Sequence, residues 1–378
     1  MKILVVDDTL VFRKIISDSL LEIPGVEIVG SASNGKVALE KIKELKPDII
    51  TLDIEMPVMN GIEVLEVIKK EKLKTGVIVL SAVTVKGGDL TIKALQLGAF
   101  DFITKPDSGT VAENRIAIVE MLTPIISAWE QKTNIISTRA VKDVSLNKNK
   151  IETKSDSSSS TKGFFASSAF EIGSFLKNLN NIKKPEIVVI GISTGGPAAL
   201  GKMLPMISGD IGVPILIVQH MPPLFTKSLA NSLNTKCKIN VKEAEDGETI
   251  NSGTAYIAPG GKQMKISASA TEKEHIIRIT DDPPENNCKP AVDYLFRSVS
   301  ALLPGKITAV VMTGMGNDGT TGMRLIKRHG GVSITQDQDS CVVYGMPMEV
   351  VKAGVSDLIV PLNMISSAIE KSVKMEGF

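Results

Sequence analysis

The first third of the chain alternates short apolar runs with amphipathic stretches. The runs at residues 2–6, 49–52 and 77–80 have the length and β-branched content of buried strands. Strand and helix patterns alternate over residues 1–121, which predicts a doubly wound, flavodoxin-like α/β domain. The segments between the strands carry apolar residues at helical spacing, at Phe12, Ile15, Ile16, Leu20, Val37, Leu39, Ile42 and Leu45.

A second set of apolar runs begins near residue 184. Residues 187–190, 215–218 and 307–312 have the composition of buried strands, and a polar or glycine-containing turn follows each of them. These runs predict a second α/β domain with a doubly wound parallel sheet over residues 184–378.

The segment between the two domains differs in composition from both. Residues 131–180 are rich in serine and contain no proline. Such a segment buries little apolar surface, so the sequence predicts a flexible linker over residues 122–183. The apolar residues within 164–176 either dock against one domain or belong to the same flexible chain.

Charge and cysteine content exclude several protein classes. A net charge of +1 and a pI of 7.6 provide no basic field for nucleic acid. The three cysteines are too far apart for a zinc site or a disulfide framework. No apolar run approaches the ~20 residues of a membrane span, and the amino terminus has a strand pattern, not a signal peptide. We therefore expect a cytoplasmic protein that neither binds nucleic acid nor inserts into a membrane.

The turn after the strand at 187–190 carries a serine between glycines. Its sequence, GISTGGP at residues 191–197, has GxSxG spacing. Small flanking residues tolerate a sharp strand-to-helix turn, so the Ser193 hydroxyl stands clear beside the free N–H groups of a helix start. This geometry suits a nucleophile. The motif alone is equally compatible with a glycine-rich turn that binds phosphate or nothing.

Two later strands end in the groups that would activate this serine. His220 closes the apolar run at 215–219, and Asp318 lies in the turn after the run at 307–312. The carboxyl ends of parallel strands meet at one edge of a sheet, so Ser193, His220 and Asp318 are expected to converge there. An imidazole can take the serine proton, and a carboxylate can orient that imidazole.

These motifs resemble a known family. GISTGGP (191–197), VQHMP (218–222) and TGMGNDG (313–319) are similar to segments of the bacterial chemotaxis protein-glutamate methylesterase/glutamine deamidase family, over about residue 185 to the last helix. The resemblance implies that Ser193 is the nucleophile, His220 the general base and Asp318 its partner. It also implies methyl-accepting chemoreceptors as substrates, with hydrolysis of glutamate methyl esters and deamidation of glutamines.

The same resemblance gives further details of the site. The backbone N–H of Met315 is implied as an oxyanion donor, Thr194 supports the site, and the esterase needs no cofactor. The sequence departs from the family at residues 288–293, CKPAVD, where the family usually has Arg-Pro-Ser-Val-Asp. Any hydrogen bond from that serine is absent, because this chain has Ala291 there.

The amino-terminal domain carries a second chemistry. Asp7 and Asp8 follow the first strand and Asp53 ends another, so three carboxylates meet at one sheet edge. A hard divalent cation such as Mg²⁺ relieves their repulsion. Ser81 and Lys105 end two further strands. Such a set suits phosphoryl transfer to Asp53, with Lys105 and the metal neutralising charge and Ser81 bonding the phosphate.

Residues 1–121 resemble a response-regulator receiver domain. The resemblance implies Asp53 as the phosphorylation site, Asp8 and Asp53 as the main Mg²⁺ ligands with Asp7 assisting, and a chemotaxis histidine kinase as phosphoryl donor. The expected function is a phosphorylation-regulated serine hydrolase for chemotactic adaptation, whose unphosphorylated receiver covers Ser193. The alternative is a phosphorylation-switched protein that binds receptors without covalent chemistry.

Overall fold

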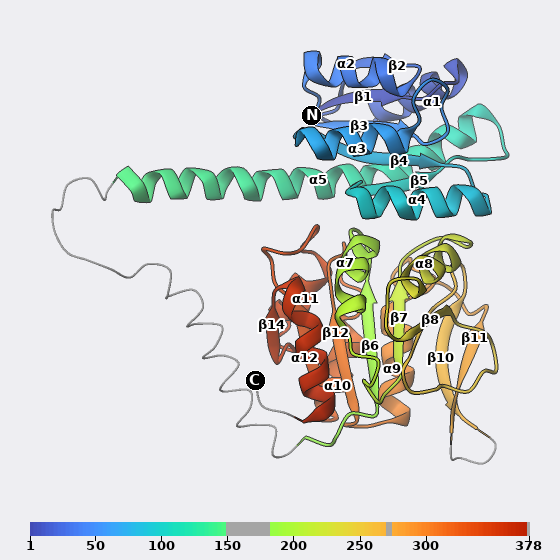
Figure 1. Ribbon diagram of the computed structural model, residues 1–378, viewed down its shortest axis with the longest axis vertical. Coiled ribbons are helices and arrows are strands. Elements are labelled where there is room, and N and C mark those ends of the chain that lie inside the picture. Colours follow the sequence, from blue (N-terminus) through green and yellow to red (C-terminus); the bar gives the residue numbers. More distant parts are fainter. Residues whose placement is uncertain (149–181, 270–273, 376–378) are drawn as a thin grey trace.

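The protein consists of two α/β domains that lie against one another. The computed structural model describes residues 1–148, 182–269 and 274–375 (Figure 1). The expected fold class, two domains built on parallel sheets, is confirmed. Within these residues, no helix is long and apolar enough to cross a membrane.

The amino-terminal domain is built on a parallel sheet with the order β2-β1-β3-β4-β5. Strands β1 and β4 are almost wholly buried because helices cover both faces of the sheet, which explains their continuous apolar runs. The strands are β1 Lys2–Val6, β2 Glu27–Ala32, β3 Ile49–Asp53, β4 Gly76–Ser81 and β5 Asp101–Thr104. The helices are α1 Leu10–Leu21, α2 Gly35–Leu45, α3 Gly61–Glu71, α4 Val85–Leu97 and α5 Val111–Lys148.

Helix α5 is longer than the sequence analysis expected. It continues from the receiver-like domain through Lys148, so the expectation of a flexible linker is wrong for residues 122–148. Leu122 and Ile126 are buried in the domain core, and Trp129 packs edge-on against Phe100 at 5.0 Å between ring centroids. These contacts extend the domain beyond residue 121. The rest of the expected linker, including the apolar segment 164–176, falls mainly on 149–181, outside the described residues.

The carboxy-terminal domain has a larger parallel sheet with the order β14-β13-β12-β6-β7-β9-β8. The central strand β6 is buried along its whole length. The strands are β6 Ile187–Ile192, β7 Ile215–Gln219, β8 Asn240–Glu243, β9 Thr254–Ile257, β12 Ile307–Val311, β13 Val332–Gln336 and β14 Leu358–Val360. An antiparallel pair, β10 Gln263–Ala268 and β11 His275–Thr280, was not expected from the sequence.

Helices cover both faces of this sheet (Figure 1). Apolar residues on opposite faces of the central strands belong to two different core clusters, as a doubly wound sheet requires. The helices are α7 Gly196–Met203, α8 Phe225–Asn234, α9 Val292–Leu302, α10 Thr320–Arg328, α11 Met346–Lys352 and α12 Leu362–Lys374, with a 3₁₀ turn at Leu204–Met206.

Helix α4 and strand β5 of the amino-terminal domain pack against the second domain. In Figure 1, α4 lies between the receiver sheet and helices α7 and α8, and residue contacts connect it to both helices. Gln96 of α4 accepts a hydrogen bond from Lys236 and donates one to Ser232. The rings of Phe102 and Phe225 pack at 4.7 Å between centroids. One face of the receiver-like domain therefore rests on the carboxyl edge of the second sheet.

Candidate functional site

Ser193 lies in a tight turn between β6 and α7. Gly195 has a φ of 78°, a left-handed conformation that favours glycine, and α7 begins at the next residue. The Ser193 N–H donates to the Thr313 carbonyl at 3.0 Å, and the Ser193 carbonyl accepts from Gln219 Nε2 at 3.0 Å. The backbone of Ser193 is thus held from both neighbouring strand ends, β7 and β12.

His220 and Asp318 meet at the same edge of the sheet. The His220 N–H donates to the Ile192 carbonyl, which places its ring beside the Ser193 turn. His220 Nε2 lies 2.8 Å from Asp318 Oδ2. The convergence expected for these two side chains is therefore present in the structure.

A dense set of hydrogen bonds fixes the Asp318 carboxylate. Besides His220, it accepts from the backbone N–H groups of Val292, Asp293 and Gly319, and from the Asn286 side chain. Burial disfavours its charge, but the hydrogen bonds from His220 and the backbone outweigh burial and lower the pKa of Asp318. The carboxylate is thus charged and firmly oriented at neutral pH.

The other imidazole nitrogen faces a cysteine. His220 Nδ1 lies 3.6 Å from Cys288 Sγ, and within the described residues the Ser193 hydroxyl makes no hydrogen bond to either ring nitrogen. Burial opposes a charge on the ring, but the hydrogen bonds to Asp318 and Cys288 outweigh it and raise the pKa of His220 to about 9. The structure therefore brings Ser193 and His220 side by side without the hydrogen bond that a completed triad requires.

The turn after β12 provides the candidate oxyanion donor. A Cβ on Gly314 would lie 2.8 Å from Ser193 Cβ, so only glycine lets this turn approach the serine so closely. The neighbouring Met315 N–H makes no hydrogen bond to any part of the chain that the structure describes. The Thr194 hydroxyl is directed toward the receiver-like domain, where it donates a hydrogen bond to Asp101 at 2.7 Å.

The receiver-like domain closes the space above Ser193. A cavity of about 60 Å³ is lined by Ser193 and His220 on one side and by Leu95, Asp101 and Phe102 on the other. Side chains of the receiver-like domain thus occupy the space directly beside Ser193 and His220. The described arrangement is therefore a covered state of the candidate active site.

Burial at this contact destabilises the charged form of the Asp101 side chain. Burial raises its pKa to about 6, although hydrogen bonds from the Thr194 hydroxyl and the Phe102 N–H act in the opposite direction. The neutral carboxylic acid is thus better accommodated between the domains than the carboxylate.

The expected acidic cluster is present at the carboxyl edge of the first sheet. One carboxylate oxygen from each of Asp7, Asp8 and Asp53 lies within 4.8 Å of the others. Lys105 Nζ lies 2.7 Å from both Asp7 and Asp53. Burial, together with repulsion from Asp7, raises the pKa of Asp53, while Lys105 acts against this shift. Three clustered carboxylates form an oxygen-rich site that fits Mg²⁺.

Ser81 lies across a small cavity from this cluster. Asp53, Ser81 and Lys105 line a common space of about 200 Å³. The Ser81 hydroxyl accepts a hydrogen bond from Thr91 of α4 at 2.6 Å, and the Ala82 and Gly87 carbonyls lie 3.2 and 3.4 Å from it as acceptors. The expected phosphate-binding hydroxyl is therefore bonded to the helix that contacts the second domain.

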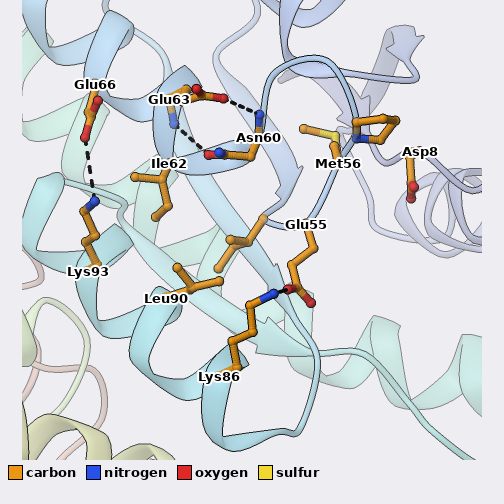
Figure 2. Close-up of a pocket in the computed structure, with 12 residues that line it drawn as sticks. Asp8, Glu55, Met56, Asn60, Ile62, Glu63, Glu66, Lys86, Leu90 and Lys93 are labelled. Carbon is orange, nitrogen blue, oxygen red and sulfur yellow. Dashed lines mark hydrogen bonds and ion pairs between the residues drawn. The ribbon is translucent and has the colours of Figure 1, made fainter.

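A broad groove gives access to the acidic cluster from the solvent. Figure 2 shows this groove, about 640 Å³ in volume, with Asp8 at one end and helices α3 and α4 along its walls. Lys86 pairs with Glu55 at 2.5 Å and Lys93 with Glu66 at 3.9 Å. Both lysines have acidic partners, and Asp8 stays exposed. The cluster is thus open to small molecules from this side.

Comparisons with known proteins agree with both halves of the chain. Residues 188–369 match the CheB methylesterase family, and residues 3–116 match the response regulator receiver domain family. A protein-glutamate methylesterase/protein-glutamine glutaminase from Desulfotalea psychrophila is 54% identical, covering 99% of each chain. The chain belongs to this family. The resemblance inferred from its motifs is therefore confirmed.

Other similar proteins carry the same name or domain. The Bacillus subtilis protein-glutamate methylesterase/protein-glutamine glutaminase is 41% identical over 99% of this chain and 99% of its own. The crystal structure of the Thermotoga maritima CheB methylesterase catalytic domain is 40% identical, covers 50% of this chain and 99% of that chain, and has a TM-score of 0.48.

Several residues at the site were not predicted from the sequence. Gln219 holds the Ser193 carbonyl, Asn286 bonds Asp318, Asp101 contacts Thr194, and Cys288 faces His220. Of these residues, only Gln219 could have been suspected from the sequence, because it is the last residue of the apolar strand that His220 follows. The other contacts join segments far apart in the chain, and no pattern around those residues marks them.

Proposed function

We propose that this protein is a protein-glutamate methylesterase and protein-glutamine glutaminase, a serine hydrolase controlled by its receiver domain. The observation that carries the proposal is the 2.8 Å hydrogen bond between His220 and Asp318, at the sheet edge where the Ser193 turn lies. Full-length similarity to proteins of that name supplies the substrate class, because the site itself implies only acyl transfer.

The reaction begins when the Ser193 hydroxyl attacks the carbonyl carbon of a glutamate γ-methyl ester. His220 in its neutral form takes the hydroxyl proton at Nδ1, because Nε2 is held by Asp318. This step requires rotation of the serine side chain toward Nδ1, which in the covered state faces Cys288. The Met315 N–H, next to the Gly314 position that approaches Ser193, is the proposed oxyanion donor.

Collapse of the tetrahedral intermediate gives an acyl-enzyme. His220 returns its proton to the leaving group, which departs as methanol from an ester or as ammonia from a glutamine amide. Water, deprotonated by the same imidazole, then attacks the acyl-enzyme and releases glutamate and free Ser193. Asp318 stabilises the imidazolium in both halves of the reaction.

Control begins at Asp53, which accepts a phosphoryl group. Asp7, Asp8 and Asp53 would hold Mg²⁺, and the cation would supply charge neutralisation to the phosphoryl oxygens. Lys105 pairs with Asp53 before the reaction, at 2.7 Å, and is placed to contact the transferred group. A chemoreceptor-associated histidine kinase is the proposed donor, with methyl-accepting chemoreceptors as the substrates, in the cytoplasm.

The structural effect of Asp53 phosphorylation is transmitted to the active site through Ser81 and helix α4. A phosphoryl group on Asp53 enters the cavity that Ser81 lines and offers that hydroxyl a strong acceptor. Ser81 then leaves its bonds to Thr91 and Gly87 on α4. Since α4 also contacts α7 and α8, its displacement weakens the covering contact and shifts the population toward an open state.

Replacing Asp53 with asparagine is expected to abolish phosphorylation. Incubation of the intact protein with acetyl phosphate and Mg²⁺ should add the mass of one phosphoryl group, and Asp53→Asn should show no added mass. The matched control is Asp107→Asn, which removes an exposed carboxylate of the same domain and should leave the mass increase unchanged. A mass increase that persists in Asp53→Asn would place the phosphorylation site elsewhere.

The covering contact is expected to weaken as pH rises. The pKa of Asp101 is raised to about 6 from 3.8, so the covered state binds the proton more tightly than a separated state with an ordinary carboxyl. The covered, docked state is therefore most stable below about pH 4. Its stability relative to the separated state falls between about pH 4 and 6 and does not change further above about pH 6. Because the pKa of Asp101 differs between 3.8 and about 6, the docking equilibrium can change by at most roughly 100-fold over this pH range.

Asp101→Asn tests this pH dependence. Asparagine can still accept from the Thr194 hydroxyl but never becomes charged, so the variant should stay covered across this range. Small-angle X-ray scattering between pH 4.5 and 7.5 should show domain separation increasing in the wild type but not in the variant. Equal increases in both proteins would contradict the role assigned to Asp101.

A further inference from the structure

Cys288 completes a Cys–His–Asp group inside the candidate active site. Its Sγ lies 3.6 Å from His220 Nδ1, while Nε2 of the same ring is bound to Asp318. A thiol within reach of an imidazole that a carboxylate orients is the arrangement that activates nucleophilic cysteines. The structure thus gives the thiol the contact with His220 that the Ser193 hydroxyl lacks.

We propose that Cys288 is a reactive thiol, activated by His220, and that its oxidation by a peroxide switches off hydrolysis at Ser193. The part concerning hydrolysis rests on the proposed function, whereas the reactivity of the thiol does not.

The surroundings of the three cysteines support this assignment. All three cysteines are partly exposed residues. Burial raises the pKa of Cys237 to about 11, against a weaker opposing effect of Lys236. Burial and repulsion from Asp337 also raise the pKa of Cys341. Neither thiol contacts an imidazole in the part of the chain that the structure describes, whereas Cys288 Sγ lies 3.6 Å from His220 Nδ1.

Access to Cys288 does not require the domains to separate. Cys288 is a partly exposed residue and is not among the residues that line the cavity beneath Asp101. It lies in the segment between β11 and α9, where Asn286 and Asn287 are exposed. A small solute such as a peroxide can therefore reach the sulfur while the receiver domain covers Ser193.

The chemistry of oxidation is a two-electron step. The Cys288 thiolate attacks one oxygen of hydrogen peroxide, an S–O bond forms, and the O–O bond breaks. The departing hydroxide takes a proton from the His220 imidazolium and leaves as water, so the products are sulfenic acid, water and neutral imidazole. Sulfur is oxidised and peroxide is reduced. The new S–OH group lies against Nδ1, the nitrogen that has to accept the Ser193 proton.

The reactivity is tested without any enzyme assay. Brief treatment of the intact protein with iodoacetamide, followed by peptide mass spectrometry, gives the alkylation rate of each cysteine. Cys288 should react at least about tenfold faster than Cys237, because its thiol contacts an imidazole that can take its proton. His220→Gln should reduce the Cys288 rate toward that of Cys237, while Ser193→Ala should leave it unchanged. Equal rates at the two cysteines, or no effect of His220→Gln, would overturn the proposal.

The regulatory part is tested by methanol release before and after hydrogen peroxide treatment, each protein being compared with its own untreated sample. The double variant Cys237→Ser/Cys341→Ser, which keeps only Cys288, should lose most of its activity and regain it with dithiothreitol. Cys288→Ser should keep its activity after the same treatment. Inactivation of Cys288→Ser, or persistent activity of the double variant with Cys288 oxidised, would refute the switch. If no protein releases methanol, the proposed function fails, while the alkylation rates still decide the reactivity of Cys288.

Discussion

Replacing Ser193 with alanine is expected to reduce methanol release from methylated receptor fragments by on the order of 10⁵- to 10⁶-fold. The variant retains the His220–Asp318 pair but loses the Ser193 hydroxyl, which lies in the turn that Gly314 approaches closely. The acyl-enzyme then cannot form. Gas chromatography of released methanol at saturating substrate measures the loss directly.

The control for Ser193→Ala uses the other domain. Asp53 of this variant should still be phosphorylated by acetyl phosphate, and its circular dichroism spectrum should match that of the wild type, which shows that both domains are folded. Methanol release at the native rate would remove Ser193 from the reaction. Receptor binding without methanol release by the wild-type protein would instead favour the alternative, a phosphorylation-switched binding protein.

Replacing Gly88 with leucine is expected to raise the basal rate of methanol release by about tenfold, within the range of typical coupling free energies between sites. Gly88 is buried where α4 meets α8, and even a Cβ there would lie 2.8 Å from Ser228 Oγ. A leucine side chain cannot fit while the domains are docked. The covered state is therefore destabilised relative to the open state, without any change at Ser193.

Asp89→Leu is the matched control, because it places the same side chain on the next, solvent-exposed position of α4. It should leave the basal rate near that of the wild type. Phosphorylation should stimulate Gly88→Leu less than the wild type, since much of its population is already open. An unchanged basal rate in Gly88→Leu, with domain separation visible by small-angle X-ray scattering, would show that the receiver does not inhibit by covering Ser193.

Much of the site was predictable because parallel sheets collect strand ends at one edge. Ser193, His220 and Asp318 follow β6, β7 and β12, which are neighbours in the sheet, so apolar runs followed by polar residues were sufficient to group them. Asp53 and Lys105 follow the same rule in the first domain. The rule places side chains at an edge but does not orient them. It therefore could not predict that His220 Nδ1 faces a thiol.

The contacts that the sequence analysis missed depend on long-range packing. The sequence analysis assigned no role to Asp101, yet its carboxylate meets Thr194 across the domain boundary. The first domain was ended at residue 121 because the chain farther along is rich in serine, yet Ile118, Leu122 and Ile125 share helical spacing in α5 and are all buried. Periodicity was a better guide there than composition.

The departure from the family sequence at residues 288–293 has a structural counterpart. Ala291 is buried, and its N–H donates to Gln263 Oε1 at 2.9 Å, so the backbone is held without a serine side chain at this position. The next two N–H groups, of Val292 and Asp293, bond Asp318. The segment thus supports the proposed triad through its backbone, which explains why the substitution leaves the His220–Asp318 pair intact.

The central claim is that phosphorylation of Asp53 uncovers a serine hydrolase. Its most direct test is methanol release from methylated chemoreceptor by the intact protein, measured with and without acetyl phosphate and Mg²⁺. The account predicts slow release without the phosphoryl donor and clearly faster release with it, and both rates should disappear in Ser193→Ala. Release that does not respond to Asp53 phosphorylation, or no release in either condition, would contradict it.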